Sequence, residues 1–245
     1  MLIAAVDTTT QAGSVALVRD DRVVASFSGE AATPHAERLP GDLTALLASH
    51  RLSLADVDVF AVATGPGSFT GLRIGIAAVQ GLAFALGKLV VAVSALEALA
   101  TAVAATDPGG HPVGVWMDAR RHEVFSAAFQ PERGHDDSVL PSLGCLEEAA
   151  VGLPALTLDR WCQMPWFSAL RWVGDGTAVY RQLLAGRLPS GVASSAQAPA
   201  IAPWVGRIGA RRAAAGQAVH PHAIQPIYVR RPDVELARAR RQARG

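Results

Sequence analysis

Short apolar runs and longer helical repeats alternate along the first hundred residues. Turn residues bound three of the runs, which predict meandering strands at 2–6, 14–18 and 23–27. Leucines at helical spacing then predict a helix up to about residue 50, through Leu39, Leu43, Leu46 and Leu47. Pro40 is expected to kink this helix or delay its start. Further strands are predicted at 57–63 and 89–93, and further helices at 71–86 and 94–104. This order predicts an α/β unit with a mixed sheet covered by helices.

The cluster of turn-forming residues at 106–112 is the clearest break in the chain and predicts a domain boundary. Beyond it, a strand that ends in Asp118 is followed by a turn and another strand, so the second half opens as the first does. A strand at 170–173, a helix at 177–184 and a helix at 203–215 are expected later. We therefore predict an N-terminal α/β domain, a divergent C-terminal α/β domain, and a last helix with an Arg-rich tail that packs back on the first half, at 1–106, 112–200 and 201–245.

Composition narrows the class of protein. Hydrophobic residues make up 50% of the chain and charged residues 18%, which excludes general disorder. The formal net charge of +1 gives no field typical of a nucleic-acid binder. Cys145 and Cys162 cannot form a disulfide framework, which fits a reducing compartment. The first residues do not form a signal peptide and no membrane span is indicated, so we expect a cytoplasmic protein.

Three polar turns can carry chemistry. The turn from Asp7 through Thr8 and Thr9 offers hydroxyls, backbone N–H groups and a carboxylate for a phosphate or a metal ion, although an ordinary Asx turn explains it too. A glycine turn joins a buried strand to a helix and can point N–H groups at an anion, through Gly65, Gly67 and Ser68. It lacks the lysine of a P-loop and the spacing of a Rossmann fingerprint. A similar turn follows the strand at 170–173, at Gly174, Asp175 and Gly176.

The helix at 71–86 is unusually apolar. Arg73 and Gln80 are its polar side, and a narrow spine of small residues runs along it at Gly71, Gly75 and Ala78. Larger apolar side chains lie beside the spine, at Leu72, Ile76, Val79 and Leu86. A helix of this kind is buried on more than one side, either by its own sheet and the preceding helix or by a second protein.

Other chemistries find little support. No His-Glu-x-x-His pair occurs, and His220-Pro221-His222 is a poor metal cage, so no metal site is predicted. No nucleophile elbow is present and neither cysteine has an activating neighbour. The aromatic cluster at Trp161, Trp166 and Phe167 fits a plug over a core or a base-stacking platform. The basic tail can be a solvated terminus or can touch phosphates, through Arg230, Arg231, Arg238, Arg240, Arg241 and Arg244.

Three segments together resemble the bacterial tRNA threonylcarbamoyladenosine biosynthesis protein TsaB family. The first is Ala4-Ala5-Val6-Asp7-Thr8-Thr9, and the third is Met117-Asp118-Ala119-Arg120-Arg121-His122-Glu123-Val124-Phe125. The second is highly specific and runs Gly65-Pro66-Gly67-Ser68-Phe69-Thr70-Gly71-Leu72-Arg73. The resemblance covers residues 1–125 and returns weakly at 174–176 and 226–230, whereas 130–168 match nothing that we can place.

The resemblance implies a fold and a place in a complex. The family has a two-domain actin-like ATPase fold with ribonuclease H-like, mixed sheets, as in sugar kinases and Hsp70. It is related to the glycoprotease-like TsaD, the subunit that transfers threonylcarbamoyl to N6 of the adenosine after the anticodon and holds a metal through a His-x-x-x-His pair. Those two positions are Ala95 and Leu99 here, which cannot bind a metal. The resemblance therefore implies a non-catalytic subunit.

The resemblance also implies partners. They are TsaD in a heterodimer, the ATPase TsaE in a ternary complex, and a second copy when TsaD is absent, with tRNA contact secondary. ATP or ADP at the complex interface is the one cofactor suggested. The partner surface is expected on the helices near 36–50 and 71–86, at Leu39, Leu43, Leu46, Gly71, Leu72, Gly75, Ala78, Val79 and Leu82. On this interpretation Gly75→Arg abolishes pairing and leaves the subunit folded.

A rival hypothesis is an enzyme, a small-molecule kinase or ATPase of the same fold. It would arrange the three polar turns around a nucleotide, with Asp118 at the end of the second repeat, whereas in a non-catalytic subunit these turns are vestigial. A third hypothesis is direct tRNA binding through the Arg-rich tail.

Overall fold

The computed structural model describes residues 1–30, 33–132, 140–188 and 198–230. Its N-terminal sheet has the strand order β3-β2-β1-β4-β5, with β1 antiparallel to β2 and parallel to β4. These strands are β1 (Leu2–Asp7), β2 (Ser14–Arg19), β3 (Arg22–Ser28), β4 (Val59–Gly65) and β5 (Leu89–Ser94). The helices of this half are α1 (His35–Ser49), α2 (Phe69–Ala85) and α3 (Ala95–Ala104), with a 3-10 turn at Leu54–Asp56.

The second sheet repeats this plan in shorter form. Its order is β8-β7-β6-β9, with β6 antiparallel to β7 and parallel to β9. The strands are β6 (Val113–Asp118), β7 (Val124–Glu132), β8 (Ser142–Gly152) and β9 (Arg171–Val173). The helices are α4 (Pro154–Trp161), α5 (Asp175–Val179), α6 (Arg181–Ala185) and α7 (Ala202–Ala214), with 3-10 turns at Phe167–Ala169 and Pro221–Ala223. The predicted fold class, two α/β parts with mixed sheets, is confirmed.

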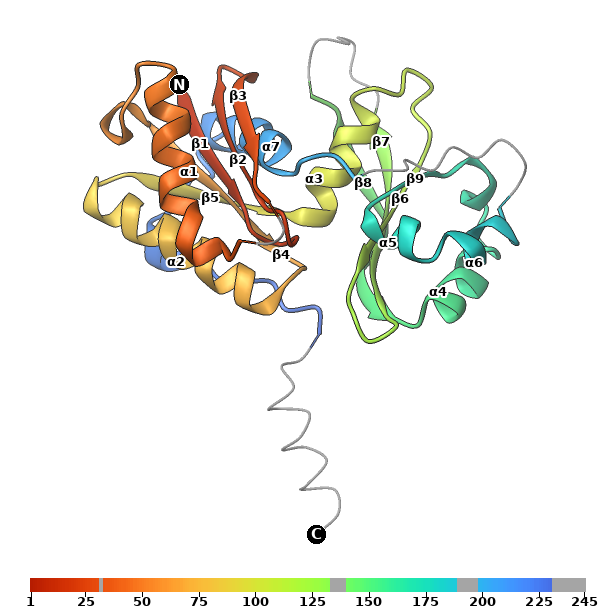
Figure 1. The fold of residues 1–245 in the computed structure, drawn as a ribbon. Coiled ribbons are helices and arrows are strands. Elements are labelled where there is room, and N and C mark those ends of the chain that lie inside the picture. Colours follow the sequence, from red (N-terminus) through yellow and green to blue (C-terminus); the bar gives the residue numbers. More distant parts are fainter. Residues whose placement is uncertain (31–32, 133–139, 189–197, 231–245) are drawn as a thin grey trace.

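The N-terminal sheet is buried on both faces. Successive side chains of a strand point to opposite faces, and in β1 both sets are covered. Leu2, Ala4 and Val6 belong to the core that includes leucines of α1, whereas Ile3 and Ala5 belong to the core that includes α7. Figure 1 shows α1 and α2 on one side of this sheet and α7 on the other. Burial on both faces explains why β1 has no alternation of polar and apolar residues.

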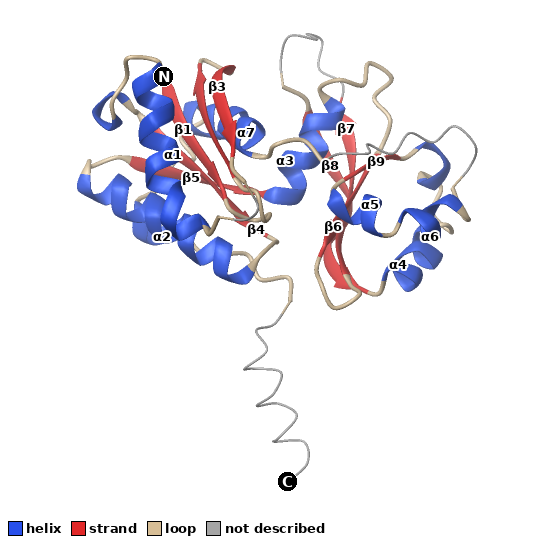
Figure 2. Cartoon of the chain, in the orientation of Figure 1, coloured by secondary structure: helices blue, strands red, loops and turns tan. Residues whose placement is uncertain are grey.

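Helix α3 lies between the two sheets, as Figure 2 shows. Its side chains Leu96 and Leu99 share one core with Val91 of β5 and with Val113 and Val115 of β6. Helix α7 follows the second sheet in sequence but packs against the first, where Gly206 lets the helix approach Val18 and Ala5 closely. The cores of the two halves are therefore continuous.

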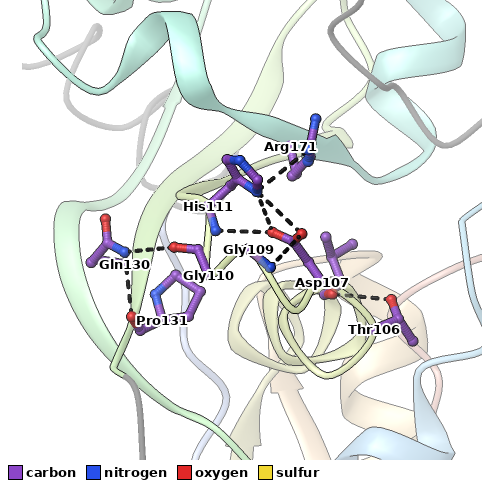
Figure 3. A network of polar contacts seen from close by, with 9 residues as sticks. Thr106, Asp107, Gly109, Gly110, His111, Gln130, Pro131 and Arg171 are labelled. Atoms are coloured by element: carbon purple, nitrogen blue, oxygen red, sulfur yellow. Dashed lines mark hydrogen bonds and ion pairs between the residues drawn. The ribbon is translucent and has the colours of Figure 1, made fainter.

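The linker from α3 to β6 is held by polar contacts (Figure 3). The Asp107 carboxylate accepts hydrogen bonds from the backbone N–H of His111 at 2.9 Å and from its ring Nδ1 at 2.8 Å. Arg171 of β9 places Nη2 3.4 Å from the same ring nitrogen. Gln130 of β7 donates to the Gly110 carbonyl at 3.0 Å. The linker is thus anchored to both neighbours of β6.

Several predicted elements differ from the structure. Helix α1 begins at His35, ahead of Pro40, so the proline does not delay the helix. The helix expected at 177–184 is two short helices that meet at Tyr180. β8 and α4 were not predicted. β7 continues to Glu132, and residues 133–139 lie outside the described residues.

Candidate functional site

The two halves repeat an Asp turn at the end of their first strand. β1 ends at Asp7, whose Oδ1 accepts hydrogen bonds from the N–H and the hydroxyl of Thr9, at 2.8 and 2.6 Å. β6 ends at Asp118, whose Oδ1 accepts from the N–H of Arg120 at 2.9 Å. Both are Asx turns, which close the strand with the carboxylate. The internal repeat is therefore one of detailed geometry as well as strand order.

A glycine turn follows the parallel strand in each half. Gly65, the last residue of β4, has φ +113°, and Gly174, directly after β9, has φ +107°, a region that side-chain-bearing residues rarely adopt. A Cβ on Gly174 would lie 2.1 Å from the Trp116 carbonyl oxygen of β6. The turns also reach the Asp turns, because Ser68 N–H donates to the Thr9 carbonyl at 2.9 Å. Glycine in these turns allows each of them to lie against a strand end.

The turns of both halves face one cavity of about 550 Å³, a size typical of small-molecule sites. Its N-terminal wall is Thr9, Thr10, Gln11, Pro66, Gly67, Ser68, Phe69 and Leu72, and its C-terminal wall is Asp118, Ala119, Arg120, Arg121, Phe125 and Asp175. The end of the described chain completes it, with Ile227, Tyr228, Val229 and Arg230. Other predicted loop residues are buried behind the lining, namely Asp7, Thr8, Gly65, Gly174 and Gly176.

Two carboxyl groups near this cavity, those of Asp7 and Asp175, have raised pKa values. Burial raises the pKa of Asp7 from 3.8 to about 6, its hydrogen bonds with Thr9 act against this, and the Asp175 charge adds to it. The second carboxylate oxygen of Asp7, Oδ2, has no hydrogen-bond partner. Burial likewise raises the pKa of Asp175, although its Oδ1 accepts the N–H of Asp118 at 2.9 Å. Within the described ranges, no group of three His, Cys, Asp or Glu side chains is placed to hold a metal ion.

The β6–β7 hairpin carries the cavity residues Arg120 and Arg121, which belong to the third family-like segment but were not predicted as site residues. Arg120, Arg121 and His122 have φ of +60°, +54° and +61°, which is strained for residues other than glycine. Phe125 and Arg230 were missed as lining residues too. The sequence did hold a signal for these lining residues, because two arginines occur in a turn directly after a strand that ends in Asp.

Several residues expected on a partner surface pack inside this chain. Leu39, Leu43, Leu72 and Val79 are buried, and a Cβ on Gly71 would lie 2.1 Å from the Thr8 carbonyl oxygen. A Cβ on Gly75 would lie 2.2 Å from Thr8 Oγ1, which itself donates to the Gly71 carbonyl at 2.8 Å. The glycine part of the spine therefore packs on β1. The expectation that Gly75→Arg leaves the fold intact is wrong, because the arginine would displace Thr8.

A different face of α1 and α2 is open. Helix α2 carries no charged residue from 74 to 86. Phe84 is 82% exposed, Ala77, Gly81 and Ala85 are also exposed, and the expected residues Leu46, Ala78 and Leu82 are half-buried. We call these residues the α1–α2 face: Leu46, Ala77, Ala78, Gly81, Leu82, Phe84 and Ala85. The prediction therefore named three residues of this face and missed the most exposed one, Phe84.

The remaining candidates fall in the core or outside the described residues. Ala95 and Leu99 lie one turn apart on α3, with exposures of 0% and 1%. Trp161 is buried on α4, with its ring 5.4 Å from that of Trp172, so it forms core and not a stacking platform. Of the basic tail, Arg230 is described and 231–245 lie outside the described residues.

Comparisons with known proteins agree on one family. The family model described as TsaD, tRNA N6-adenosine threonylcarbamoyltransferase, matches residues 28–215. The tRNA threonylcarbamoyladenosine biosynthesis protein TsaB of Haemophilus influenzae is 31% identical over 191 residues, 74% of this chain and 75% of the relative. The solved structure of YeaZ from Pseudomonas aeruginosa superposes with a TM-score of 0.73 at 33% identity and covers 93% of this chain and 99% of that one.

Other curated relatives match over a shorter length. TsaB of Bacillus subtilis is 34% identical over 141 residues, which is 58% of this chain and 60% of that protein. The chain thus spans about three fifths of the length of that relative. No helix among the described residues combines the length and the apolar character that crossing a bilayer requires.

Proposed function

This chain belongs to the TsaB branch of the TsaD family, and from that premise we propose that it is a non-catalytic subunit in the formation of tRNA N6-threonylcarbamoyladenosine. Its task is to bind and support a TsaD partner, with the ATPase TsaE in the same complex. The names of the relatives support a role in the biosynthesis of tRNA threonylcarbamoyladenosine, and the residues of this chain support a non-catalytic part in it.

Two positions of α3 support the proposal that this chain does not carry out the metal-dependent transfer. The positions that the resemblance assigns to two metal-binding histidines are Ala95 and Leu99, which are buried among apolar side chains of both sheets. Apolar side chains cannot ligate a metal, and both positions lie in a packed apolar core. The transfer reaction is therefore assigned to TsaD.

The α1–α2 face is the observation that carries the docking role. Exposed helix faces normally carry charged residues, yet α2 has none from 74 to 86. Phe84 is 82% exposed near the C-terminal end of α2, and the small exposed residues Ala77, Gly81 and Ala85 allow a second helix to approach closely. The nearest polar side chain on the helix, Gln80, is occupied, because it donates to the carbonyls of Pro221 and Ile224 at 2.9 and 3.0 Å. The occupant we propose is the matching helix pair of TsaD, or of a second copy when TsaD is absent.

The test is Phe84→Glu in the full chain. Phe84 is almost fully exposed, so the variant stays folded, but it places a charge in the contact. Loss of an aromatic anchor costs about 2–4 kcal/mol of binding, roughly a 30- to 1,000-fold weaker complex. Binding to TsaD is measured by titration, and self-association by light scattering after size-exclusion chromatography. Modified tRNA from the reconstituted system should fall in parallel.

Leu156→Glu is the matched control. Leu156 is 64% exposed on α4, in the other half of the molecule, so this variant adds the same charge at another exposed apolar position. It should bind TsaD as the unmodified chain does. Undiminished binding by Phe84→Glu, or equal losses in both variants, would show that the α1–α2 face is not the docking surface.

The second candidate is a small-molecule kinase or ATPase, and the cavity between the paired turns is what favours it. Against it, the cavity lining offers no evident pair of side chains for general acid and general base catalysis on a bound substrate. Calorimetry of the isolated chain with ATP and Mg²⁺ separates the two. Micromolar binding of ATP together with its turnover would support the kinase or ATPase. If the chain does not bind ATP, the docking role is favoured.

A further inference from the structure

The end of the described chain spans both halves across the cavity. On the N-terminal side, Ile227 N–H donates to the Thr64 carbonyl at 2.7 Å, at the end of β4. The Tyr228 ring lies 5.3 Å from the Phe69 ring between centroids, and its hydroxyl accepts a hydrogen bond from Arg73 Nε at 3.2 Å. Backbone and side chain are thus both fixed at the start of α2.

On the C-terminal side, Arg230 contacts the β6–β7 hairpin. Its Nη1 donates to the Ala119 carbonyl at 2.9 Å, and its Nη2 forms an ion pair with Glu123. The guanidinium carbon lies 5.7 Å from the centroid of the Phe125 ring. A planar guanidinium that makes two polar contacts at once fixes its partner loop in orientation as well as in distance.

Contacts at the two ends of β6 join the two halves of the molecule. The linker anchored by Asp107 and His111 enters β6 at its first residue, Val113. The Arg230 contacts are made just beyond the other end of the same strand, at Ala119. Figure 1 shows the final described segment leaving the N-terminal half below α2, on the side that faces the second sheet. The two halves are therefore held together at both ends of β6.

We propose that Ile227, Tyr228, Val229 and Arg230 form a clasp that sets the angle between the halves and closes one wall of the cavity. Release of Arg230 from the hairpin opens the cavity to small molecules. This inference is independent of the docking role, because it concerns the other end of α2 and its test needs no partner protein.

The test measures the separation of the halves in the full chain. Pulsed electron paramagnetic resonance measures this distance between two spin labels. One label is attached to the natural Cys145 of β8 and the other to a cysteine introduced by Ser49→Cys in α1. Cys162 is replaced by Ala so that it is not labelled. Arg230→Ala and Glu123→Gln remove the ion pair from its two ends. Both should broaden the distribution toward longer separations. In Arg230→Ala, hydrogen exchange at the Ile227 amide should also speed up by about tenfold or more, because a clasp held at one end opens more often.

Arg187→Ala is the control. Arg187 pairs with Asp159 at 2.9 Å within the C-terminal half, so its removal deletes an ion pair without touching the clasp. It should change neither measurement. An unchanged distance distribution in Arg230→Ala, or an equal broadening in Arg187→Ala, overturns the clasp.

Discussion

The charged form of Asp7 is unfavourable at the buried end of β1. Its carboxylate is buried, Oδ2 has no partner, and its pKa rises from 3.8 to about 6. Between these two values the folded state keeps a proton that the unfolded state releases. The free energy of unfolding therefore falls as pH rises through this window, by about 1.4 kcal/mol per pH unit and about 3 kcal/mol altogether.

Asp7→Asn tests this effect. The amide keeps an oxygen that can accept from Thr9, and it does not titrate. We expect the stability of the variant relative to the unmodified chain to increase by about 2.5 kcal/mol between pH 4 and pH 7.5, measured by urea unfolding at both values. Asp159→Asn, at a half-exposed ion pair, should change by about 0.5 kcal/mol or less. A pH-independent difference for Asp7→Asn would contradict the raised pKa.

Two glycines of α2 make a second pair of residue-scale predictions. Gly71→Ala pushes a methyl group against the Thr8 backbone and should cost about 1–3 kcal/mol of stability. Gly81→Ala meets no atom within 4 Å and removes a flexible residue from an exposed helix, so it should add up to about 1 kcal/mol. Thermal unfolding of both variants measures the two signs. Destabilisation by both changes would contradict the packing described here.

For single residues, the sequence predicts which positions allow close packing but not which neighbour they pack against. The spacing of Gly71 and Gly75 correctly indicated a close approach, but a pattern of small residues does not say whether the neighbour is a strand of the same chain or another protein. Tertiary contact with Thr8 decides that. Phe84 could have been singled out, because it is the one aromatic residue on the helix beyond its first residue, but its exposure depends on how α2 packs in the folded chain.

Among elements, the strands and helices with strong periodicity were predictable, and β8 and α4 were not. β8 is an edge strand whose pairing with β7 shifts register twice near Ala128, so its side chains do not alternate cleanly between faces. α4 begins with Pro154 and is too short for helical periodicity to be recognised above chance. The tryptophan cluster beneath it depends on contacts between distant segments, which no local pattern contains.

Helix α3 supports a prediction at the scale of one element. Restoring histidines with Ala95→His and Leu99→His together should not create a metal site, because both positions lie in the core shared by the two sheets. Two imidazoles there overfill the core and bury polar nitrogens, so we expect a loss of about 3 kcal/mol or more. Zinc content after dialysis and the unfolding midpoint measure the two effects. Leu99→Met, which keeps the volume, should cost less than about 1.5 kcal/mol. Stoichiometric zinc in a stable double variant would show that α3 can still serve as a ligand helix.

For the whole molecule, the repeated order of strands was visible in the sequence, but the way the halves join was not. The turn-forming residues at 106–112 suggest a boundary between two separate domains. However, α3, which precedes this boundary, packs on the second sheet, and α7, which follows it, packs on the first. One core therefore holds Ile3 and Ala61 of the first sheet together with Val115 and Val173 of the second. Such an exchange of helices cannot be read from local patterns, because the apolar residues of a helix do not indicate which sheet they pack against.

A shared core predicts one cooperative unfolding transition. Gly71→Ala strains contacts in the N-terminal half alone, yet it should lower the urea midpoint equally for amides of β1 and β6, measured by hydrogen exchange. Leu99→Ala removes a core side chain that both sheets contact and should lower both midpoints further, with a loss of about 2–5 kcal/mol. If Gly71→Ala shifts β1 and leaves β6 unchanged, the halves unfold separately, and the continuity of their core contributes little to stability.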